Sequence, residues 1–172
     1  MAGPSLWDQV CHIEPVGAIT IPVTKKGKIR LQKTPRPVVL PSEIEPSFPE
    51  TYPMENWGRW MVEVPRGFPI RSEKPEETAL RETVEEAQSP VLKIRKIGEV
   101  NANSTFYVHM IPVFVVHIDE DWKGELSKDV NEKVIKGEDH EPEEIRRMIR
   151  EGVISDGLTL AALNLYFCRE GI

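Results

Sequence analysis

The chain has 172 residues, 29% of them charged, and its formal net charge at pH 7 is −6. This length can bury a sizeable core but is short for two independent domains, so we expect one domain over residues 1–172. The acidic balance and the lack of a basic tract argue against wholesale electrostatic binding to nucleic acid. No apolar run is long enough to span a bilayer, since the best candidate, residues 110–118, has only the length of a strand.

The first part of the chain has a pattern that predicts a β-hairpin. Residues 16–23 are apolar and β-rich, residues 25–28 read as a turn, and residues 29–32 alternate as a strand does. The next stretch, residues 35–52, is dense in proline and predicts a long surface loop. Residues 60–64 predict another strand.

A helix is predicted to begin at Pro75, after a glycine loop at Gly67. Proline suits the first helical position, because an N–H group there would have no partner inside the helix. Glu76 and Glu77 follow in the first turn, where negative charge is favourable beside the positive end of the helix dipole.

The later part of the chain predicts two more strands, over residues 91–100 and 105–118. Residues 119–144 are polar, with scattered glycine, and predict mostly loop. Strands with interspersed helices indicate an α/β (α+β) sandwich.

Two further helices are predicted near the C-terminus. A short amphipathic helix over residues 143–151 ends at Gly152. A final helix over residues 158–167 follows Ser155 and Asp156, which have the side chains of an N-cap.

The helix from Pro75 carries an unusual concentration of acid. One stripe is apolar and predicted to face the core: Leu80, Val84 and Ala87. Three carboxylates are predicted on the opposite face, where they would repel one another: Glu82, Glu85 and Glu86. Arg81 can neutralise only part of this charge, whereas a divalent cation would turn repulsion into ligation. Oxygen ligands without Cys or His favour Mg²⁺ or Mn²⁺ over zinc; the alternative is a solvated acidic face.

The spacing of these residues resembles the Nudix box of the Nudix hydrolase family. Gly67 is followed by five residues and Glu73, and then by seven residues and Arg81-Glu82-x-x-Glu85-Glu86. The resemblance implies an α/β/α sandwich with a mixed sheet between helices, and hydrolysis of a pyrophosphate bond that depends on Mg²⁺ or Mn²⁺.

The end of the box departs from the family pattern. Thr83 and Ser89 stand where the family usually has apolar residues, and Gln88 stands where it has glycine. Glycine would end the helix in a left-handed turn, so Gln88 implies either a different helix exit or about 1 kcal/mol of strain.

The resemblance also assigns roles to the residues of the box. The metal ligands would be the Gly67 carbonyl and three carboxylates, Glu82, Glu85 and Glu86. Arg81 would orient Glu85 or Glu73, and Glu73 would brace the loop. In the family a general base often comes from a distant loop, for which Glu138 and Glu141 are the candidates here, with Glu120 and Asp121 as second choice.

The segment Glu63-Val64-Pro65-Arg66-Gly67 is similar to the ADP-ribose pyrophosphatase branch of the family. That branch often carries a Gln-x-Arg element on an earlier strand; here Gln32 is present but the arginine is displaced to Arg36. This likeness implies ADP-ribose or a nucleotide sugar as substrate and a homodimer as the assembly.

Four residues are candidate substrate contacts: Arg36, Glu63, Arg66 and Phe68. Trp57, Trp60 and Phe106 could also stack on a base, or simply pack, and Arg71 could hold phosphate or be a solvated surface residue.

Two other functions stay open. One is a Nudix hydrolase of nucleoside triphosphates, dinucleoside polyphosphates or capped RNA ends. The other is a nucleotide sensor without turnover, a class that usually loses the glutamates that this box keeps. The N-terminus lacks the features of a secretory signal, and Cys11 and Cys168 fit no redox spacing, so we expect a cytoplasmic protein without membrane association.

Overall fold

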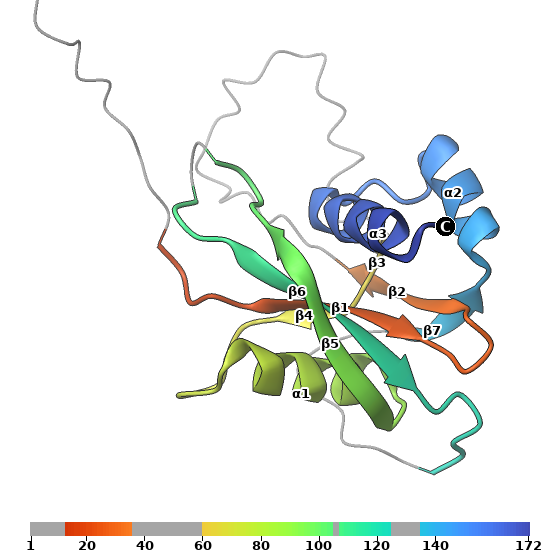
Figure 1. The fold of residues 1–172 in the computed structure, drawn as a ribbon, viewed down its shortest axis with the longest axis horizontal. Helices are drawn as coiled ribbons and strands as arrows, with labels where there is room; N and C mark the ends of the chain where they lie inside the picture. Colours follow the sequence, from red (N-terminus) through yellow and green to blue (C-terminus); the bar gives the residue numbers. More distant parts are fainter. Residues whose placement is uncertain (1–12, 36–59, 105–106, 125–134) are drawn as a thin grey trace, which may run out of the picture.

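The computed structural model describes residues 13–35, 60–104, 107–124 and 135–172. Within them, seven strands form one mixed sheet (Figure 1): β1 Ala18–Val23, β2 Ile29–Pro35, β3 Trp60–Glu63, β4 Arg66–Gly67, β5 Val91–Val100, β6 Ile111–Ile118 and β7 Ile135–His140. Five of them follow the order β3-β2-β1-β6-β5, while β4 pairs with β1 and β7 pairs with β2. The β1–β6 pair is parallel and the other pairs are antiparallel.

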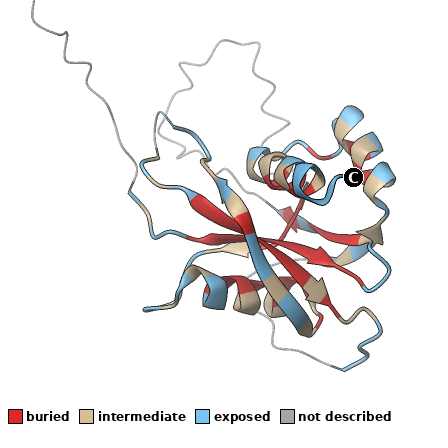
Figure 2. Cartoon of the chain, viewed as in Figure 1, coloured by how far each residue is buried: buried red, intermediate tan, exposed pale blue. Residues whose placement is uncertain are grey.

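Helices cover both faces of this sheet, which gives the predicted three-layer sandwich. Helix α1, Pro75–Ala87, lies on one face, and α2, Pro142–Arg150, and α3, Gly157–Glu170, lie on the other (Figure 1). The central strands β1 and β6 are therefore buried on both faces (Figure 2) and are almost wholly apolar.

The core divides into two clusters, one on each face of the sheet. Toward α2 and α3, Ile19 and Ile21 of β1 pack with Ile145 of α2 and Leu163 of α3. Toward α1, the alternate residues of the same strands pack against the helix: Ala18, Phe114, Val116 and Ile118 with Ala79. Because side chains alternate along a strand, β1 and β6 contribute to both clusters.

Most of the predicted elements are confirmed. The hairpin joins β1 to β2 with Val23 opposite Ile29, and β5 spans the predicted residues. Helix α1 begins at Pro75, and α3 is capped by Asp156, whose carboxylate accepts a hydrogen bond from the Thr159 backbone N–H. The proline-dense stretch falls almost entirely within residues 36–59, outside the described residues.

Two predictions about the later part of the chain were wrong. The strand expected over residues 105–118 begins only at Ile111, and the expected loop over residues 119–144 contains β7. The sequence of β7, IKGEDH, has no apolar alternation, so it gave no strand signal. Its pairing with β2 rests on backbone hydrogen bonds and on Arg30, which donates to Asp139 at 2.6 Å.

Of the three residues predicted to form the buried face of α1, only Ala87 is buried. Leu80 and Val84 are only partly buried. The buried side chains belong to a neighbouring stripe that includes two of the acidic residues: Thr78, Ala79, Glu82, Thr83, Glu86 and Ala87. The reason is the position of β4, which lies against α1 and contacts these carboxylates directly.

Helix α1 ends in the conformation that glycine would favour, although the residue there is Gln88. Its φ of 50° and ψ of 45° are left-handed, so the strained exit is the one observed. The Gln88 side chain offsets part of this strain by donating to the carbonyls of Val84 and Glu85, at 3.1 and 2.6 Å.

Candidate metal and substrate site

Strand β4 brings Gly67 directly against α1. A Cβ atom built on Gly67 would lie 1.8 Å from Oε1 of Glu82, so any side chain at this position would overlap the carboxylate. Gly17 plays a similar part on the other side, since its own Cβ would lie 2.4 Å from the Gly67 carbonyl oxygen. Sequence analysis found Gly67 from its motif but missed Gly17, which no local pattern marks.

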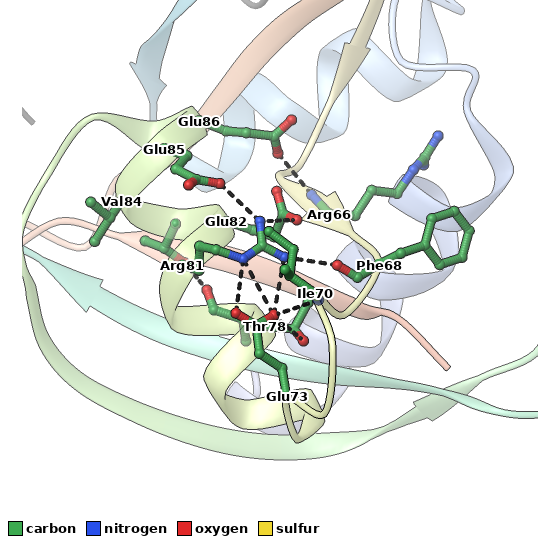
Figure 3. Close-up of polar contacts among 12 residues, drawn as sticks. Arg66, Phe68, Ile70, Glu73, Thr78, Arg81, Glu82, Val84, Glu85 and Glu86 are labelled. Atoms are coloured by element: carbon green, nitrogen blue, oxygen red, sulfur yellow. Dashed lines mark hydrogen bonds and ion pairs between the residues drawn. The ribbon is translucent and has the colours of Figure 1, made fainter. Parts of the chain in front are cut away.

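The carboxylates of Glu82 and Glu86 are buried beside this strand, with 6% and 4% of each residue exposed. Oε2 of Glu86 accepts a hydrogen bond of 2.9 Å from the backbone N–H of Arg66 (Figure 3). The last turn of α1 is thereby fixed to β4, one residue before Gly67.

Arg81 lies at the centre of the acidic cluster (Figure 3). Its Nη1 donates to Glu82 and to Glu85, both at 2.8 Å, and its Nε donates to Glu73 at 3.1 Å. Its Nη2 donates to the Phe68 carbonyl at 2.7 Å. Burial, the largest single influence, would lower the pKa of Arg81, but the hydrogen bonds to Glu73 and Glu85 together with the charge and hydrogen bond of Glu82 outweigh it and raise that pKa.

Glu73 ties the loop after Gly67 to α1. Besides Arg81, its carboxylate accepts from the Ile70 backbone N–H at 3.0 Å and from the Thr78 hydroxyl at 3.2 Å. Its hydrogen bonds to Arg81 and Ile70 hold the pKa of Glu73 below its ordinary value.

The donors gathered around β4 fit a hard cation in kind, because all are oxygens: the Gly67 carbonyl and the carboxylates of Glu82, Glu85 and Glu86. In the part of the chain that the structure describes, however, no three Asp, Glu, His or Cys side chains are arranged to hold a metal ion. The Arg81 guanidinium occupies the space between Glu82 and Glu85. A cation held by all three carboxylates therefore requires Arg81 to release at least one of them.

A cavity of about 350 Å³ opens next to these residues. Its polar wall includes Arg66, Gly67, Arg81 and Glu82, and its apolar wall includes Phe68, Ile70, Ile111 and Leu158. Glu14, which sequence analysis did not single out, also lines it and lies 3.8 Å from Nε2 of His109.

Arg66 was predicted to contact substrate, and the structure places its guanidinium between two carboxylates. Nη1 and Nη2 donate to Asp156, and Nη2 also donates to Glu63 at 3.2 Å. Glu63 is fully buried, at 0% exposed. Both of these predicted substrate residues thus take part in an internal ion-pair network, and Asp156 is a member that sequence analysis saw only as a helix cap.

The remaining candidates lie elsewhere or outside the described residues. Glu138 lines a separate cavity of about 230 Å³ with Met148 of α2, and Glu141 pairs with Lys28 at 3.2 Å. The second-choice bases, Glu120 and Asp121, both contact Lys25. Trp60 lies on β3 and is about half exposed. Three candidates fall outside the described part of the chain: Arg36, Trp57 and Phe106. The distal base therefore stays a prediction.

Comparison with known proteins gives a family and a fold. A family model described as NUDIX domain matches residues 16–160. A solved structure named NUDIX hydrolase from Nitrosomonas europaea superposes with a TM-score of 0.61 at 14% identity, covering 90% of each chain. A second, named ADP compounds hydrolase, superposes with a TM-score of 0.58 at 11% identity, covering 90% of this chain and 74% of its own. No curated protein matches the chain, and none of the described helices has the length and hydropathy to cross a membrane.

Proposed function

The chain belongs to the NUDIX domain family, and from this premise we propose that it hydrolyses the pyrophosphate bond of a nucleoside diphosphate linked to a second group, with ADP-ribose or a nucleotide sugar as substrate. The observation that carries the proposal is the contact between Gly67 and Glu82 in the wall of the 350 Å³ cavity. It joins the oxygen donors of the box to a space of the size that ligand pockets have.

The cofactor of this proposal is Mg²⁺ or Mn²⁺, held by the Gly67 carbonyl and by the carboxylates of Glu82, Glu86 and Glu85. Glu85 becomes available as a ligand when Arg81 releases it. A divalent cation supplies charge screening at the phosphates and lowers the pKa of a bound water. The chain does the rest. Arg81 holds Glu73 and the Phe68 carbonyl, which keeps the loop after Gly67 against α1.

The apolar wall of the cavity gives the substrate a place for its organic group. Phe68 is 52% exposed at this wall and offers an aromatic face on which a base can stack. Ile111 and Leu158 add further apolar surface to the lining of the cavity. These features support a nucleotide with a bulky second group over inorganic pyrophosphate.

The choice of ADP-ribose or a nucleotide sugar rests on the likeness of residues 63–67 to the ADP-ribose pyrophosphatase branch. The single domain over residues 1–172, the homodimer and the cytoplasmic location are parts of the same proposal. Light scattering on the purified chain tests the assembly, since it gives the mass of a dimer or of a monomer directly.

The proposal is tested by product release from a panel of substrates with Mg²⁺ or Mn²⁺, and with EDTA as control. The panel holds ADP-ribose, a nucleoside diphosphate hexose, a nucleoside triphosphate and a diadenosine polyphosphate. We expect cleavage of one of the first two to a nucleoside monophosphate, with no product in EDTA. Cleavage of the last two alone would keep the reaction and refute the substrate.

The matched variant for this assay is Glu86→Gln. Glutamine keeps an oxygen that can accept from the Arg66 N–H, so the fold should be retained, while the charge needed for the cation is lost. Loss of an outer partner of a metal ligand commonly costs 10–100-fold, so loss of a ligand should reduce turnover by about 100-fold or more. Full activity of this variant would refute the ligand assignment. Tight nucleotide binding by the unmodified chain without turnover would favour the sensor.

A further inference from the structure

Strand β4 is held from two sides through a single residue, Arg66. Its backbone N–H donates to Glu86 of α1, and its guanidinium donates to Asp156 at the start of α3 (Figure 3 shows the α1 side). The two helices lie on opposite faces of the sheet. Arg66 thus links the acidic helix to an element that carries none of the residues of the box.

The start of α3 contacts the chain before β4 in a second place. The Val64 backbone N–H donates to the Thr159 hydroxyl at 3.3 Å, while the Thr159 backbone N–H donates to Asp156 at 2.8 Å. One carboxylate therefore caps α3 and also holds the guanidinium of Arg66. The segment from Val64 to Arg66 is fastened to the first turn of α3 by both contacts.

The charges around Arg66 explain why this arrangement is stable. The guanidinium is mostly buried between Asp156 and the fully buried Glu63, so its positive charge is shared by two carboxylates. Burial is the largest single influence and would by itself raise the pKa of Asp156, but the hydrogen bond and charge of Arg66 and the hydrogen bonds from Thr159 together outweigh it, and the pKa lies below its ordinary value. Asp156 is therefore ionised at the near-neutral pH of the assays.

We propose that Asp156 is a positioning residue for the cation site: by holding the Arg66 guanidinium, it fixes the backbone that presents the Gly67 carbonyl and binds the Glu86 carboxylate. The inference rests on the proposed function. It also changes the expected role of Arg66, whose guanidinium serves the internal network rather than a substrate phosphate. The ligands of a cation need such support, because outer partners orient them.

The substitution Asp156→Asn separates this role from helix capping. Asparagine caps a helix about as well as aspartate, so α3 should persist and the melting temperature should fall by only a few degrees. The ion pair with Arg66 is lost, however. We expect Mn²⁺, titrated into the intact chain and followed by electron paramagnetic resonance, to bind on the order of 10-fold more weakly than to the unmodified chain.

Asp119→Asn is the matched control. It makes the same exchange at an aspartate that is also paired with a basic residue, Lys25, and that also accepts a backbone hydrogen bond. Gly67 pairs with Ala18, the first residue of β1, and β1 runs parallel to β6. Asp119 comes directly after the last residue of β6, so it lies at the opposite end of these two strands from Gly67. We expect its Mn²⁺ affinity to equal that of the unmodified chain.

Arg66→Lys changes the other residue of the Arg66–Asp156 contact. It tests the positioning role of Asp156 even if the Asp156→Asn variant does not fold. Lysine keeps the charge beside Glu63 but cannot form the two-pronged contact with Asp156. A matching loss of Mn²⁺ affinity would support the proposal. Unchanged Mn²⁺ affinity in a folded Asp156→Asn or Arg66→Lys variant would overturn it.

The proposed function fails in a different way. If the unmodified chain binds Mn²⁺ but turns over no substrate, the hydrolase is refuted, while the affinities of the variants still decide the role of Asp156. If the unmodified chain binds no Mn²⁺, both proposals are overturned.

Discussion

At the scale of single residues, the two glycines of the site are required by space rather than by backbone conformation. Neither Gly17 nor Gly67 has a positive φ, but a Cβ on either would overlap an oxygen of the site. A Cβ on Gly67 would overlap a carboxylate oxygen of Glu82, and a Cβ on Gly17 would overlap the carbonyl oxygen of Gly67. The two absent side chains leave room for the donors to converge.

Gly67→Ala should therefore damage the site more than the fold. The new Cβ must displace the Glu82 carboxylate, which lies 1.8 Å from its position, and this moves a ligand that we assign to the cation. We expect turnover to fall about 100-fold and the melting temperature to change by only a few degrees, measured by steady-state kinetics and thermal unfolding.

Gly157→Ala is the control for this prediction. Nothing lies within 4 Å of a Cβ at Gly157, so alanine there should leave both turnover and the fold intact. Full turnover by Gly67→Ala would show that the Glu82 carboxylate can move away without consequence for the reaction.

At the scale of elements, the sequence predicts what is decided locally. Proline and glycine positions, strand alternation and the Asp156 cap lie within a few residues of the elements they define, and those elements were predicted well. Strand β7 was missed because it is polar and depends on Arg30, which is distant in sequence. Glu14 and Gly17 were missed because no local pattern marks them, and only the tertiary fold brings them to the cavity.

The buried face of α1 is a case in which periodicity misleads. The apolar residues Leu80 and Val84 suggested the core face, yet the helix buries Glu82 and Glu86 instead. Hydrophobic burial would favour the opposite rotation. The contacts of these carboxylates with β4 hold the helix in the observed rotation, which agrees with the role that we propose for them.

The end of α1 gives a prediction about stability. Inside a helix alanine is more stable than glycine by about 1 kcal/mol, but Gln88 has a left-handed backbone that any Cβ strains. We therefore expect Gln88→Gly to be more stable than Gln88→Ala by about 1 kcal/mol, measured by urea unfolding. Both variants lose the side-chain bonds to Val84 and Glu85, so their difference reports the backbone alone.

The same pair of substitutions at Glu76, an exposed residue in the first turn of α1, supplies the comparison. There alanine should be the more stable of the two. If alanine were also the more stable at position 88, the helix would not end in a left-handed residue in solution.

At the scale of the whole molecule, the proposed cation site joins parts of the chain that are far apart in sequence. Strand β4 lies against α1 on one face of the sheet and is tied to α3 on the other by Arg66 and Asp156. Binding at such a site should stabilise the entire fold, because the unfolded chain does not bring Gly67, Glu82 and Glu86 together.

A divalent cation should therefore raise the melting temperature, and the gain in the free energy of unfolding should grow with the logarithm of its concentration above the dissociation constant. At a concentration of 100 times the dissociation constant, Mg²⁺ or Mn²⁺ should add about 2.7 kcal/mol to the free energy of unfolding. Calorimetry with increasing Mn²⁺, and then with EDTA, measures this gain and its reversal. Glu82→Gln should abolish it, since the variant removes a carboxylate from the cluster, whereas Glu143→Gln, on an exposed part of α2, should preserve it. An equal gain in both variants would place the cation elsewhere on this acidic chain, and the repulsion between Glu82 and Glu85 would then be relieved by their hydrogen bonds with Arg81.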